Sequence, residues 1–326
     1  APKYSALASE LGFIFLQECV VEVDELKRKL ITSSETEVTY SQLVISTGVT
    51  TDYSLVGGLK EYAYGFSNLN DLLRIKKLIN TINNSSNHKN PLVIAGAGPT
   101  GVELACKLSD LVNNRVEICL VDKGNKILSK SKSFNREKAI QAISERNIKV
   151  YLEHYIESIN ENIIELSTFD TSRNNSLKIN YSGLLWTAGL RPCRLQLVDH
   201  LLDENKKIKV NRFLQINEYQ NIFLVGDIVC CESYPFPSSA QVAMQQGSLT
   251  AQNIISLRNG NQLKSFQFED LGEMLSLGIG NASISGYGIT LAGPLAFKIR
   301  HFAYLMRMPG FSLLFKSAGS RLFSKK

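Results

Sequence analysis

A short glycine-rich segment limits the folds open to this chain more than any other feature of its 326 residues. Residues 96–101 read Gly-Ala-Gly-Pro-Thr-Gly, follow an apolar run at 91–95 and precede a helical pattern at 102–112. A second apolar run, 116–121, closes with Asp122. Strand, glycine turn, helix and strand in this order form a βαβ unit, which requires parallel strands. The sequence therefore predicts an α/β fold with a doubly wound sheet.

Each glycine of the turn has a separate task if the turn binds a dinucleotide. Gly96 permits the tight turn, Gly98 lets a pyrophosphate approach the backbone, and Gly101 lets the helix pack closely on the strand. Pro99 and Thr100 complete the turn, whose free N–H groups and helix dipole attract phosphate. The nucleotide interpretation is favoured over a glycine turn in an unrelated α/β fold because strand, helix and acid all stand in the required places.

Two carboxylates accompany the turn. Asp122 stands where a carboxylate accepts hydrogen bonds from ribose hydroxyls, which favours NADH over NADPH, although the neighbouring Lys123 could tolerate a 2′-phosphate. Glu103 is expected in the first turn of the helix. Its position alone favours a carboxylate stabilised by the helix dipole over a group beside the nicotinamide.

Further candidate positions lie at strand ends, where ligands of open α/β sheets bind. These ends carry Thr47 and Gly48, the run Thr187-Ala188-Gly189, and the pair Gly226 and Asp227. Asp227 could accept hydrogen bonds from a ribose or ribityl hydroxyl. Each such glycine on its own is more often a simple turn.

Two glutamines in the expected helix 240–257 form a second candidate feature. Gln241 and Gln245 are four residues apart, so both project from one helix face. Small neighbours leave room beside them for a flat ligand, and an amide can donate to a carbonyl oxygen. In isolation this segment would favour a solvated glutamine face.

Apolar alternation and turn residues indicate the remaining elements. A helix is expected at 135–146, a polar linker at 80–90, and strands at 13–17, 19–23, 29–32, 40–46, 149–152, 163–166, 177–181 and 222–225.

The positive charge of the chain is concentrated in its last 53 residues. The net charge is +6, and Glu273 is the last acidic residue. The segment 274–326 holds seven Lys or Arg, which leaves 29 basic and 30 acidic side chains in the body. A basic segment rich in Phe and Leu points to an anionic surface. No run of 18 uncharged apolar residues exists, so no membrane-spanning helix is expected.

Two amphipathic helices are expected in this tail, at 295–308 and 311–323, separated by Pro309-Gly310. In the first helix an apolar stripe lies opposite Arg300 and Arg307 and consists of Leu295, Ile299, Phe302 and Met306. Helices with this layout lie in a membrane interface. The alternative is an ordinary amphipathic helix docked on the core. The lack of acidic residues favours lipid, and nucleic acid is disfavoured because so many exposed apolar residues would serve no purpose there.

The six cysteines and four histidines do not suggest a metal or redox centre. No Cys-x-x-Cys pair occurs, and the histidines are scattered. A reduced, intracellular setting is therefore expected, and no metal site.

Four segments together resemble the type II NAD(P)H:quinone oxidoreductases, single-subunit flavoproteins of the pyridine nucleotide-disulfide oxidoreductase class. They are VIAGAGPTGVELA (93–105), WTAGLRP (186–192), FLVGD (223–227) and AQVAMQQG (240–247). The last is similar to the quinone-site helix of the family. The stretch 291–309 resembles the cyanobacterial and plastid subgroup, whose members are associated with reduction of demethylphylloquinone-like naphthoquinones.

The resemblance implies two Rossmann-like dinucleotide-binding domains, the first incomplete, and a C-terminal amphipathic membrane-anchoring segment. The implied divisions are an FAD-binding remnant at 1–80, an NAD(P)H domain at 91–186, a second FAD part with the quinone helix at 187–260, and a membrane-association segment at 261–326. Family members open with a further glycine turn for the FAD pyrophosphate, and this chain begins beyond that unit.

The resemblance also implies roles for individual residues. NAD(P)H is held by Gly96, Gly98, Pro99, Thr100, Gly101 and Asp122; FAD is bordered by Thr47, Gly48, Gly189, Gly226 and Asp227. Glu103 then lies near the nicotinamide and flavin, and Gln241 and Gln245 frame the quinone slot. The resemblance implies a peripheral protein on the cytoplasmic side of a thylakoid or plasma membrane that passes electrons to a membrane quinone. It also allows a homodimer and implies no binding of nucleic acid.

Two alternatives remain open from the residues alone. A soluble flavin disulfide reductase of the glutathione-reductase type would carry its cysteine pair upstream of these residues, although it has no use for a basic amphipathic tail. A nucleotide-binding fragment without flavin fits the visible residues equally well. A flavin absorption band near 450 nm would separate this fragment from an oxidoreductase.

Overall fold

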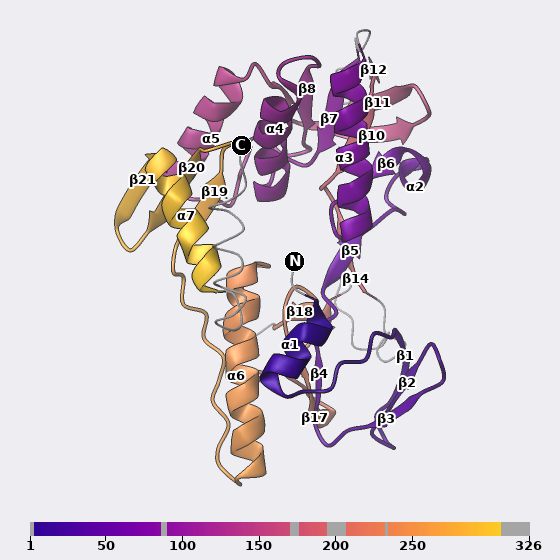
Figure 1. Cartoon of the computed structure of the whole chain (residues 1–326), viewed down its shortest axis with the longest axis vertical. Helices are drawn as coiled ribbons and strands as arrows, with labels where there is room; N and C mark the ends of the chain where they lie inside the picture. Colours follow the sequence, from indigo (N-terminus) through magenta and orange to yellow (C-terminus); the bar gives the residue numbers. More distant parts are fainter. Residues whose placement is uncertain (1–2, 86–89, 170–175, 194–206, 232–233, 308–326) are drawn as a thin grey trace. The chain divides into compact units, whose positions relative to one another are not determined.

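The computed structural model describes residues 3–85, 90–169, 176–193, 207–231 and 234–307 of the chain (Figure 1). Two compact units divide it: unit 1 comprises 1–12, 51–190 and 271–326, and unit 2 comprises 13–50 and 191–270. Residues 51–80, assigned above to an FAD-binding remnant, lie in unit 1 with the predicted nucleotide domain, and so do residues 271–307 of the C-terminal segment, whereas its residues 261–270 belong to unit 2.

The helices of the described residues are α1 (Tyr4–Leu11), α2 (Leu59–Tyr62), α3 (Leu69–Asn84), α4 (Pro99–Val112), α5 (Ser133–Glu145), α6 (Ala240–Arg258) and α7 (Pro294–Met306). The strands of unit 1 are β6 (Ala63–Tyr64), β7 (Leu92–Ala95), β8 (Ile118–Val121), β9 (Lys149–Tyr151), β10 (His154–Ile159), β11 (Ile163–Thr168), β12 (Leu177–Asn180), β13 (Gly183–Trp186), β19 (Glu273–Ser276), β20 (Ala282–Gly286) and β21 (Ile289–Gly293).

Unit 1 is built on the predicted parallel sheet. Its strand order is β6-β13-β7-β8-β9, and β7 pairs in parallel with β8 on one side and β13 on the other. All four residues of β7, β8 and β13 are buried. Strands buried on both faces read as continuous apolar runs, which is why the runs at 91–95 and 116–121 could be recognised in the sequence.

The alternation of side chains along these strands divides the core of unit 1 into two layers. Leu92 and Ile94 of β7 pack with residues of α3, α4 and α5 on one face. Val93 and Ala95 pack on the other face, against residues of the antiparallel sheet β10-β11-β12. The glycine turn therefore begins at the end of a strand covered on both sides, which holds it rigidly.

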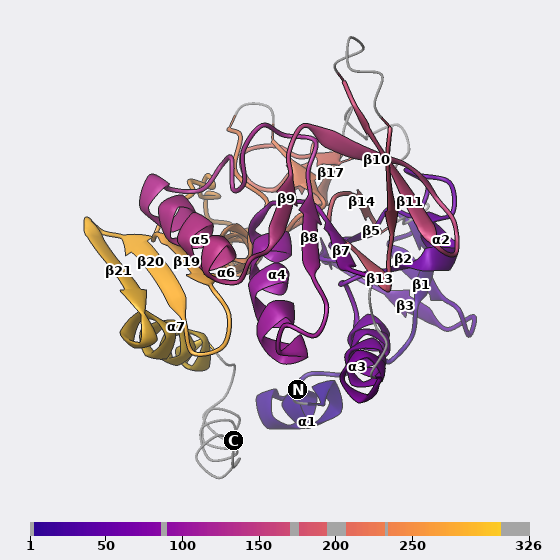
Figure 2. The same cartoon turned by 90° about the horizontal axis from the view of Figure 1, so that it is seen from above.

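The C-terminal part of unit 1 contains a small sheet that the sequence analysis did not foresee. Strands β19, β20 and β21 form an antiparallel meander, and α7 lies across it (Figure 2). These strands are short and rich in Ser and Gly, so their periodicity is weak. The second predicted tail helix, 311–323, lies outside the described residues.

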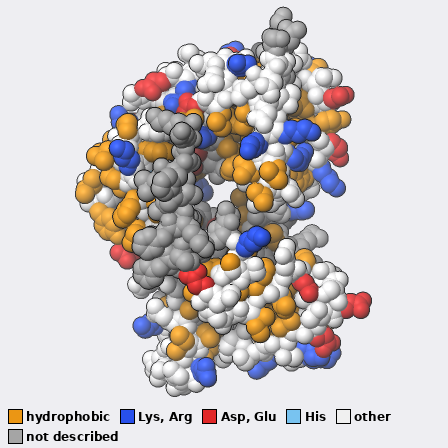
Figure 3. Space-filling model, viewed as in Figure 1, with side chains coloured by type: hydrophobic (Ala, Val, Ile, Leu, Met, Phe, Trp, Pro, Cys, Tyr) orange, Lys and Arg blue, Asp and Glu red, His pale blue; other side chains and the backbone are white. Residues whose placement is uncertain are grey.

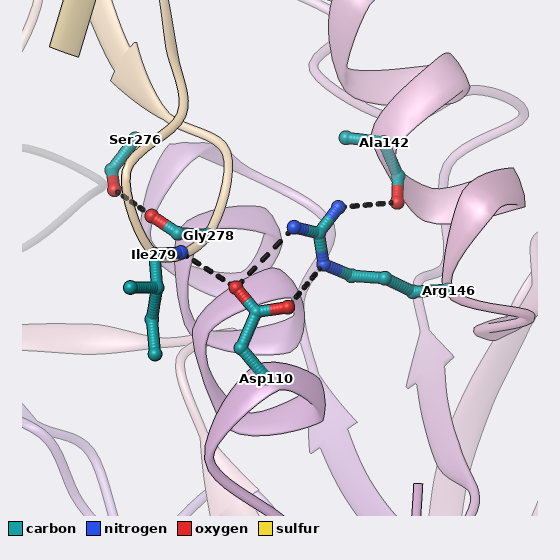
Figure 4. Close-up of polar contacts among 6 residues, drawn as sticks. All are labelled: Asp110, Ala142, Arg146, Ser276, Gly278 and Ile279. Carbon is teal, nitrogen blue, oxygen red and sulfur yellow. Dashed lines mark hydrogen bonds and ion pairs between the residues drawn. The ribbon is translucent and has the colours of Figure 1, made fainter. Parts of the chain in front are cut away.

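A half-buried charge cluster ties this sheet to the nucleotide domain (Figure 4). Asp110 on α4 accepts hydrogen bonds from Arg146 Nε at 2.8 Å and Nη2 at 3.3 Å, and from the backbone N–H of Ile279. Arg146 also donates to the carbonyl of Ala142 at 3.0 Å. A carboxylate held by a bidentate guanidinium and a backbone donor is a strong anchor, so α4, α5 and the β19–β20 loop are joined at one point.

Unit 2 is smaller and contains the candidate positions at 47–48, 226–227 and 240–247. Its strands are β1 (Val20–Asp24), β2 (Lys29–Thr32), β3 (Glu37–Thr39), β4 (Leu43–Ile45), β15 (Ile208–Lys209), β16 (Gln215–Ile216), β17 (Tyr219–Leu224) and β18 (Val229–Cys230), while β5 (Val49–Thr51) and β14 (Leu190–Pro192) pair where the chain passes between units. One sheet has the order β16-β17-β4, with β17 parallel to β4, and α6 contributes Val242 to the core.

Two expectations for secondary structure were wrong. Residues 13–17 form no strand, and all five are exposed, because an apolar run alone does not provide a pairing partner. The expected linker at 80–90 begins later, since α3 continues to Asn84. That helix starts with a capping box between Asn68 and Asp71, a signal the sequence analysis overlooked.

Candidate active site

The predicted nucleotide turn adopts the geometry that its glycines suggested. Gly96 has φ +103°, and a Cβ there would lie 2.7 Å from Thr187 Oγ1. A Cβ on Gly101 would lie 1.8 Å from the carbonyl oxygen of Gly96. The close packing of α4 on the turn therefore requires both glycines. Thr187 completes this packing, since its hydroxyl donates to the carbonyl of Ala95 at 2.7 Å.

Gly98 differs from its neighbours because the protein itself does not require it. Its φ is −75°, which any residue adopts, and an added Cβ would meet no protein atom within 4 Å. Gly98 is also the N-cap of α4, where no side chain caps the helix, and Pro99 and Thr100 are exposed. An uncapped helix start with open space above it fits the phosphates of a dinucleotide.

Asp122 is held beside the turn by two backbone donors. One carboxylate oxygen accepts from the N–H of Ala97 at 2.6 Å, and the other accepts from the N–H of Gly124 at 2.7 Å. Each oxygen retains a further lone pair, so the fixed carboxylate can still accept from ribose hydroxyls. Lys123 is exposed beside it.

Glu103 lies past the first turn of α4, contrary to expectation, because the helix begins at Pro99 and carries no acidic residue in its first turn. Its Oε1 accepts from the backbone N–H of Ser276 at 2.7 Å and from Arg300 Nη2 at 3.2 Å. Burial raises the pKa of the Glu103 carboxyl, and these two donors oppose the rise. The helix dipole is therefore not its principal partner, and sequence reasoning did not anticipate Arg300.

The flavin-side candidates of the sequence analysis lie in unit 2, apart from Gly189. Gly48 and Gly226 both have positive φ, +64° and +85°, so each needs the freedom of glycine. The N–H of Val229 donates to the carbonyl of Gly226 at 3.2 Å, which places the half-buried Asp227 in a tight turn. In unit 1, the carbonyl of Gly189 accepts from the N–H of Asp52.

A mainly apolar cavity of about 280 Å³ opens at the end of β4. Its lining comprises Val20, Val23, Leu30, Leu43, Val44, Ile45, Ser46 and Thr47. Thr47 thus borders a cavity of suitable character for part of a large cofactor. The two turns with positive-φ glycines, the half-buried carboxylate of Asp227 and this cavity have the mixed polar and apolar character that a large cofactor such as FAD requires.

The glutamines of α6 do not share one role. The Gln245 amide makes two bonds with the backbone of Glu269, donating to its carbonyl at 2.8 Å and accepting from its N–H at 3.0 Å. Gln241 is half-buried one turn earlier. Gln246, which the sequence analysis did not single out, is fully buried, and its Oε1 accepts from the N–H of Gly226 at 2.7 Å.

Comparison with known proteins agrees with this geometry. The family model for pyridine nucleotide-disulphide oxidoreductases matches residues 5–247. Demethylphylloquinone reductase NdbB of Synechocystis is 32% identical over 319 residues, which cover 95% of this chain and 78% of the relative. Type II NADH:quinone oxidoreductase of Staphylococcus aureus is 27% identical, with 96% of this chain and 80% of the relative covered. The structure of NDH2 from Plasmodium falciparum in complex with NADH superposes with a TM-score of 0.81 at 18% identity, over 92% of this chain and 81% of that one.

The chain belongs to the pyridine nucleotide-disulphide oxidoreductase family. Within it, the relatives identified by sequence are quinone reductases, which confirms the resemblance drawn from the four sequence segments.

Proposed function

We propose that this protein is an FAD-dependent NAD(P)H:quinone oxidoreductase of type II that works at a membrane surface and reduces a naphthoquinone or plastoquinone. The observation that carries the proposal is the open Gly98 turn beside a fixed Asp122, in a chain 32% identical to a demethylphylloquinone reductase. When bound, NAD(P)H and FAD supply hydride transfer and onward electron transfer to the quinone.

The residues of unit 1 bind and orient the nucleotide. The start of α4 and the backbone around Gly98 hold its phosphates, while Asp122 accepts from the ribose hydroxyls. Asp122 favours NADH, since a carboxylate repels a 2′-phosphate. We assign Glu103 to the nicotinamide end of the nucleotide, and its two hydrogen-bond donors, Ser276 and Arg300, orient its carboxylate.

The residues of unit 2 serve FAD and quinone. The turn at Gly226 and Asp227, with Thr47 and Gly48 at the end of β4, holds polar groups of FAD. On α6, Gln241 and Gln245 are the residues proposed to frame the quinone slot, and the amide of Gln245 makes two hydrogen bonds with the backbone of Glu269. Gln245 then shapes the slot by fixing the 269 segment beside α6.

Helix α7 supplies the proposed membrane contact. Its predicted apolar stripe is exposed, with Leu295, Ile299, Phe302 and Met306 between 44% and 64% accessible, whereas Ala296 on the other side is fully buried. Figure 3 shows hydrophobic side chains gathered at the outer edge of unit 1, around the β20–β21 hairpin. The stripe is therefore not docked on the core, which favours the lipid interpretation over the rival one.

Attachment through α7 is peripheral. Among the described residues, no helix combines the length and apolar character needed to cross a bilayer. The basic excess after Glu273 adds attraction to anionic headgroups. Tyr287 and Ile289, both more than 60% exposed in the β20–β21 hairpin, extend the apolar edge.

The decisive experiment is NADH oxidation by the purified protein with and without quinone. We expect a flavin band near 450 nm and turnover that depends on an added naphthoquinone. Gln241→Leu should raise KM for quinone while NADH binding, measured separately, stays unchanged. Gln252→Leu, an exposed glutamine on the same helix, is the matched control. Oxidation that proceeds equally without quinone and is insensitive to Gln241→Leu would refute the proposal.

A further inference from the structure

The two adjacent glutamines at 245 and 246 point to different parts of unit 2. Gln245 is half-buried and bonds to Glu269. Gln246 has 0% exposed surface, and its only hydrogen bond among the described residues is accepted by Oε1 from the N–H of Gly226. Its Nε2 is buried without an acceptor there. A fully buried glutamine with one half unsatisfied is costly, so a specific use for its oxygen is expected.

That use is visible in the turn above it. Gly226 has φ +85°, and a Cβ there would come no closer than 3.8 Å to the nearest atom, Ala243 Cβ. The turn is closed by the bond from the N–H of Val229 to the carbonyl of Gly226, and Val229 is 2% exposed. The Gln246 oxygen thus holds Gly226, the first residue of the turn, while burial in the core holds Val229 at the end of the turn.

Asp227 is the residue whose direction this arrangement determines. It follows Gly226 directly and is half-buried, whereas Ile228 beyond it is 1% exposed. If the Gly226 N–H lost its acceptor, the Val225–Gly226 peptide would be free to rotate in search of another. Glycine imposes no steric barrier to that rotation, so the direction in which the chain enters Asp227 would change with it.

We propose that Gln246 is a positioning residue for FAD, acting through Gly226 to fix the carboxylate of Asp227. The inference rests on the proposed function, since it takes FAD as the ligand of that carboxylate. The competing explanation is that Gln246 only stabilises the fold by satisfying a buried N–H, with no consequence for the ligand beyond general loss of stability.

A double-mutant cycle on FAD affinity separates the two explanations. The variants are Gln246→Met, which keeps the length of the side chain but removes the acceptor, Asp227→Asn, and the double variant. The dissociation constant for FAD is measured by flavin fluorescence on the purified full chain. Each single change should weaken binding about tenfold, the size expected for loss of one hydrogen bond to a charged or buried group.

If Gln246 acts through Asp227, the double variant binds FAD about as weakly as the weaker single variant. Independent effects would multiply to about a hundredfold and would overturn the proposal. Gln252→Met, at an exposed position of α6, is the matched control and should bind FAD like the wild type.

Two further measurements cover variants that fold poorly or bind nothing. The free energy of unfolding of Gln246→Met, measured in urea, separates general destabilisation from a specific loss of FAD affinity, because a variant that stays fully folded and still binds FAD weakly is not explained by stability alone. Amide hydrogen exchange of residues 222–229 reports the hydrogen bond between the Gly226 N–H and Gln246 in the absence of any ligand. The exchange should be faster in Gln246→Met but unchanged in Gln252→Met. If the wild type binds no FAD, the proposed function fails; if it binds and Gln246→Met binds equally, only the present inference fails.

Discussion

Glu103 and Arg300, nearly 200 positions apart in the chain, are joined by a contact of 3.2 Å between Oε1 and Nη2. Glu103 belongs to the helix that starts at the nucleotide turn, and Arg300 belongs to α7, whose opposite face carries the exposed apolar stripe. The guanidinium also lies 4.8 Å from the ring centre of Tyr304, which holds it on the inner side of α7. One ion pair thus connects the proposed membrane helix to the nucleotide helix.

Burial of Glu103 gives the stability of the protein a defined pH dependence, which Arg300 reduces. Burial raises the Glu103 pKa above its ordinary value of 4.5, so the folded state binds the proton more tightly than the unfolded chain does. Stability therefore falls as pH rises from about that value through the raised pKa, and is then constant. Glu103→Gln should remove this part of the pH dependence, which urea unfolding measures over roughly pH 4 to 8.

Arg300→Gln tests the partner. Loss of the cation should raise the Glu103 pKa further, because Arg300 opposes the effect of burial. The pH range over which stability falls should then extend closer to neutral pH. The free-energy difference from wild type should reach about 1 kcal/mol at high pH, a modest value because both side chains are partly exposed, and should shrink in acid. Arg300→Lys should recover part of it. A difference that is the same at every pH would show that the Arg300 side chain contributes packing alone.

The three glycines of the nucleotide turn should separate stability from binding. Gly98→Ala meets no protein atom within 4 Å, so the free energy of unfolding should change by less than about 0.5 kcal/mol while NADH affinity falls at least about tenfold. Gly101→Ala would place Cβ 1.8 Å from the Gly96 carbonyl and should destabilise the protein by on the order of 3 kcal/mol. Thermal unfolding and NADH titration measure the two effects. Unimpaired NADH binding by Gly98→Ala would place the phosphates elsewhere.

The nucleotide half of the site could be predicted because local physics determines it. Three signals are visible within about 30 residues of sequence: a buried parallel strand, a turn that requires Gly96 and Gly101, and the acidic residue that ends the next strand. The exposed stripe of α7 was equally readable from its spacing. The sequence could not show what the stripe faces, since periodicity identifies an apolar side of a helix without saying whether protein or lipid covers it.

Long-range partners could not be predicted in the same way. Arg300 was expected simply to point away from the apolar stripe, and nothing within α7 indicates that it reaches Glu103. Gln245 and Gln246 are chemically identical neighbours, and only the packing of α6 directs one to Glu269 and the other to Gly226. The β19–β21 sheet was missed because short strands rich in Ser and Gly depend on the contact with α4 and α5 for their stability.

Cys106 and Cys119 should behave as buried, inert thiols. Burial raises the pKa of Cys106 to about 11 and that of Cys119 to about 12, so neither forms a nucleophilic thiolate at neutral pH. Iodoacetamide at mildly alkaline pH should label the exposed Cys19 and leave these two unmodified until the protein is unfolded, as read by peptide mass spectrometry. Rapid labelling of Cys106 or Cys119 in the native protein would contradict the burial of these two thiols.

The exposed stripe of α7 should govern attachment to lipid. Phe302 is 64% exposed, so Phe302→Glu should leave thermal stability nearly unchanged while reducing binding to vesicles of phosphatidylglycerol and phosphatidylcholine by roughly tenfold, because an aromatic side chain is no longer buried in the interface. Leu72 on α3, 49% exposed, provides a matched control: Leu72→Glu adds the same charge to another apolar position of unit 1 and should bind vesicles like the wild type. Co-sedimentation at low and high salt separates the apolar contribution from that of the basic residues, since only the second is screened. Equal losses in both variants would mean that the added charge, not the α7 surface, controls binding, and equal binding in both would remove α7 from the membrane contact.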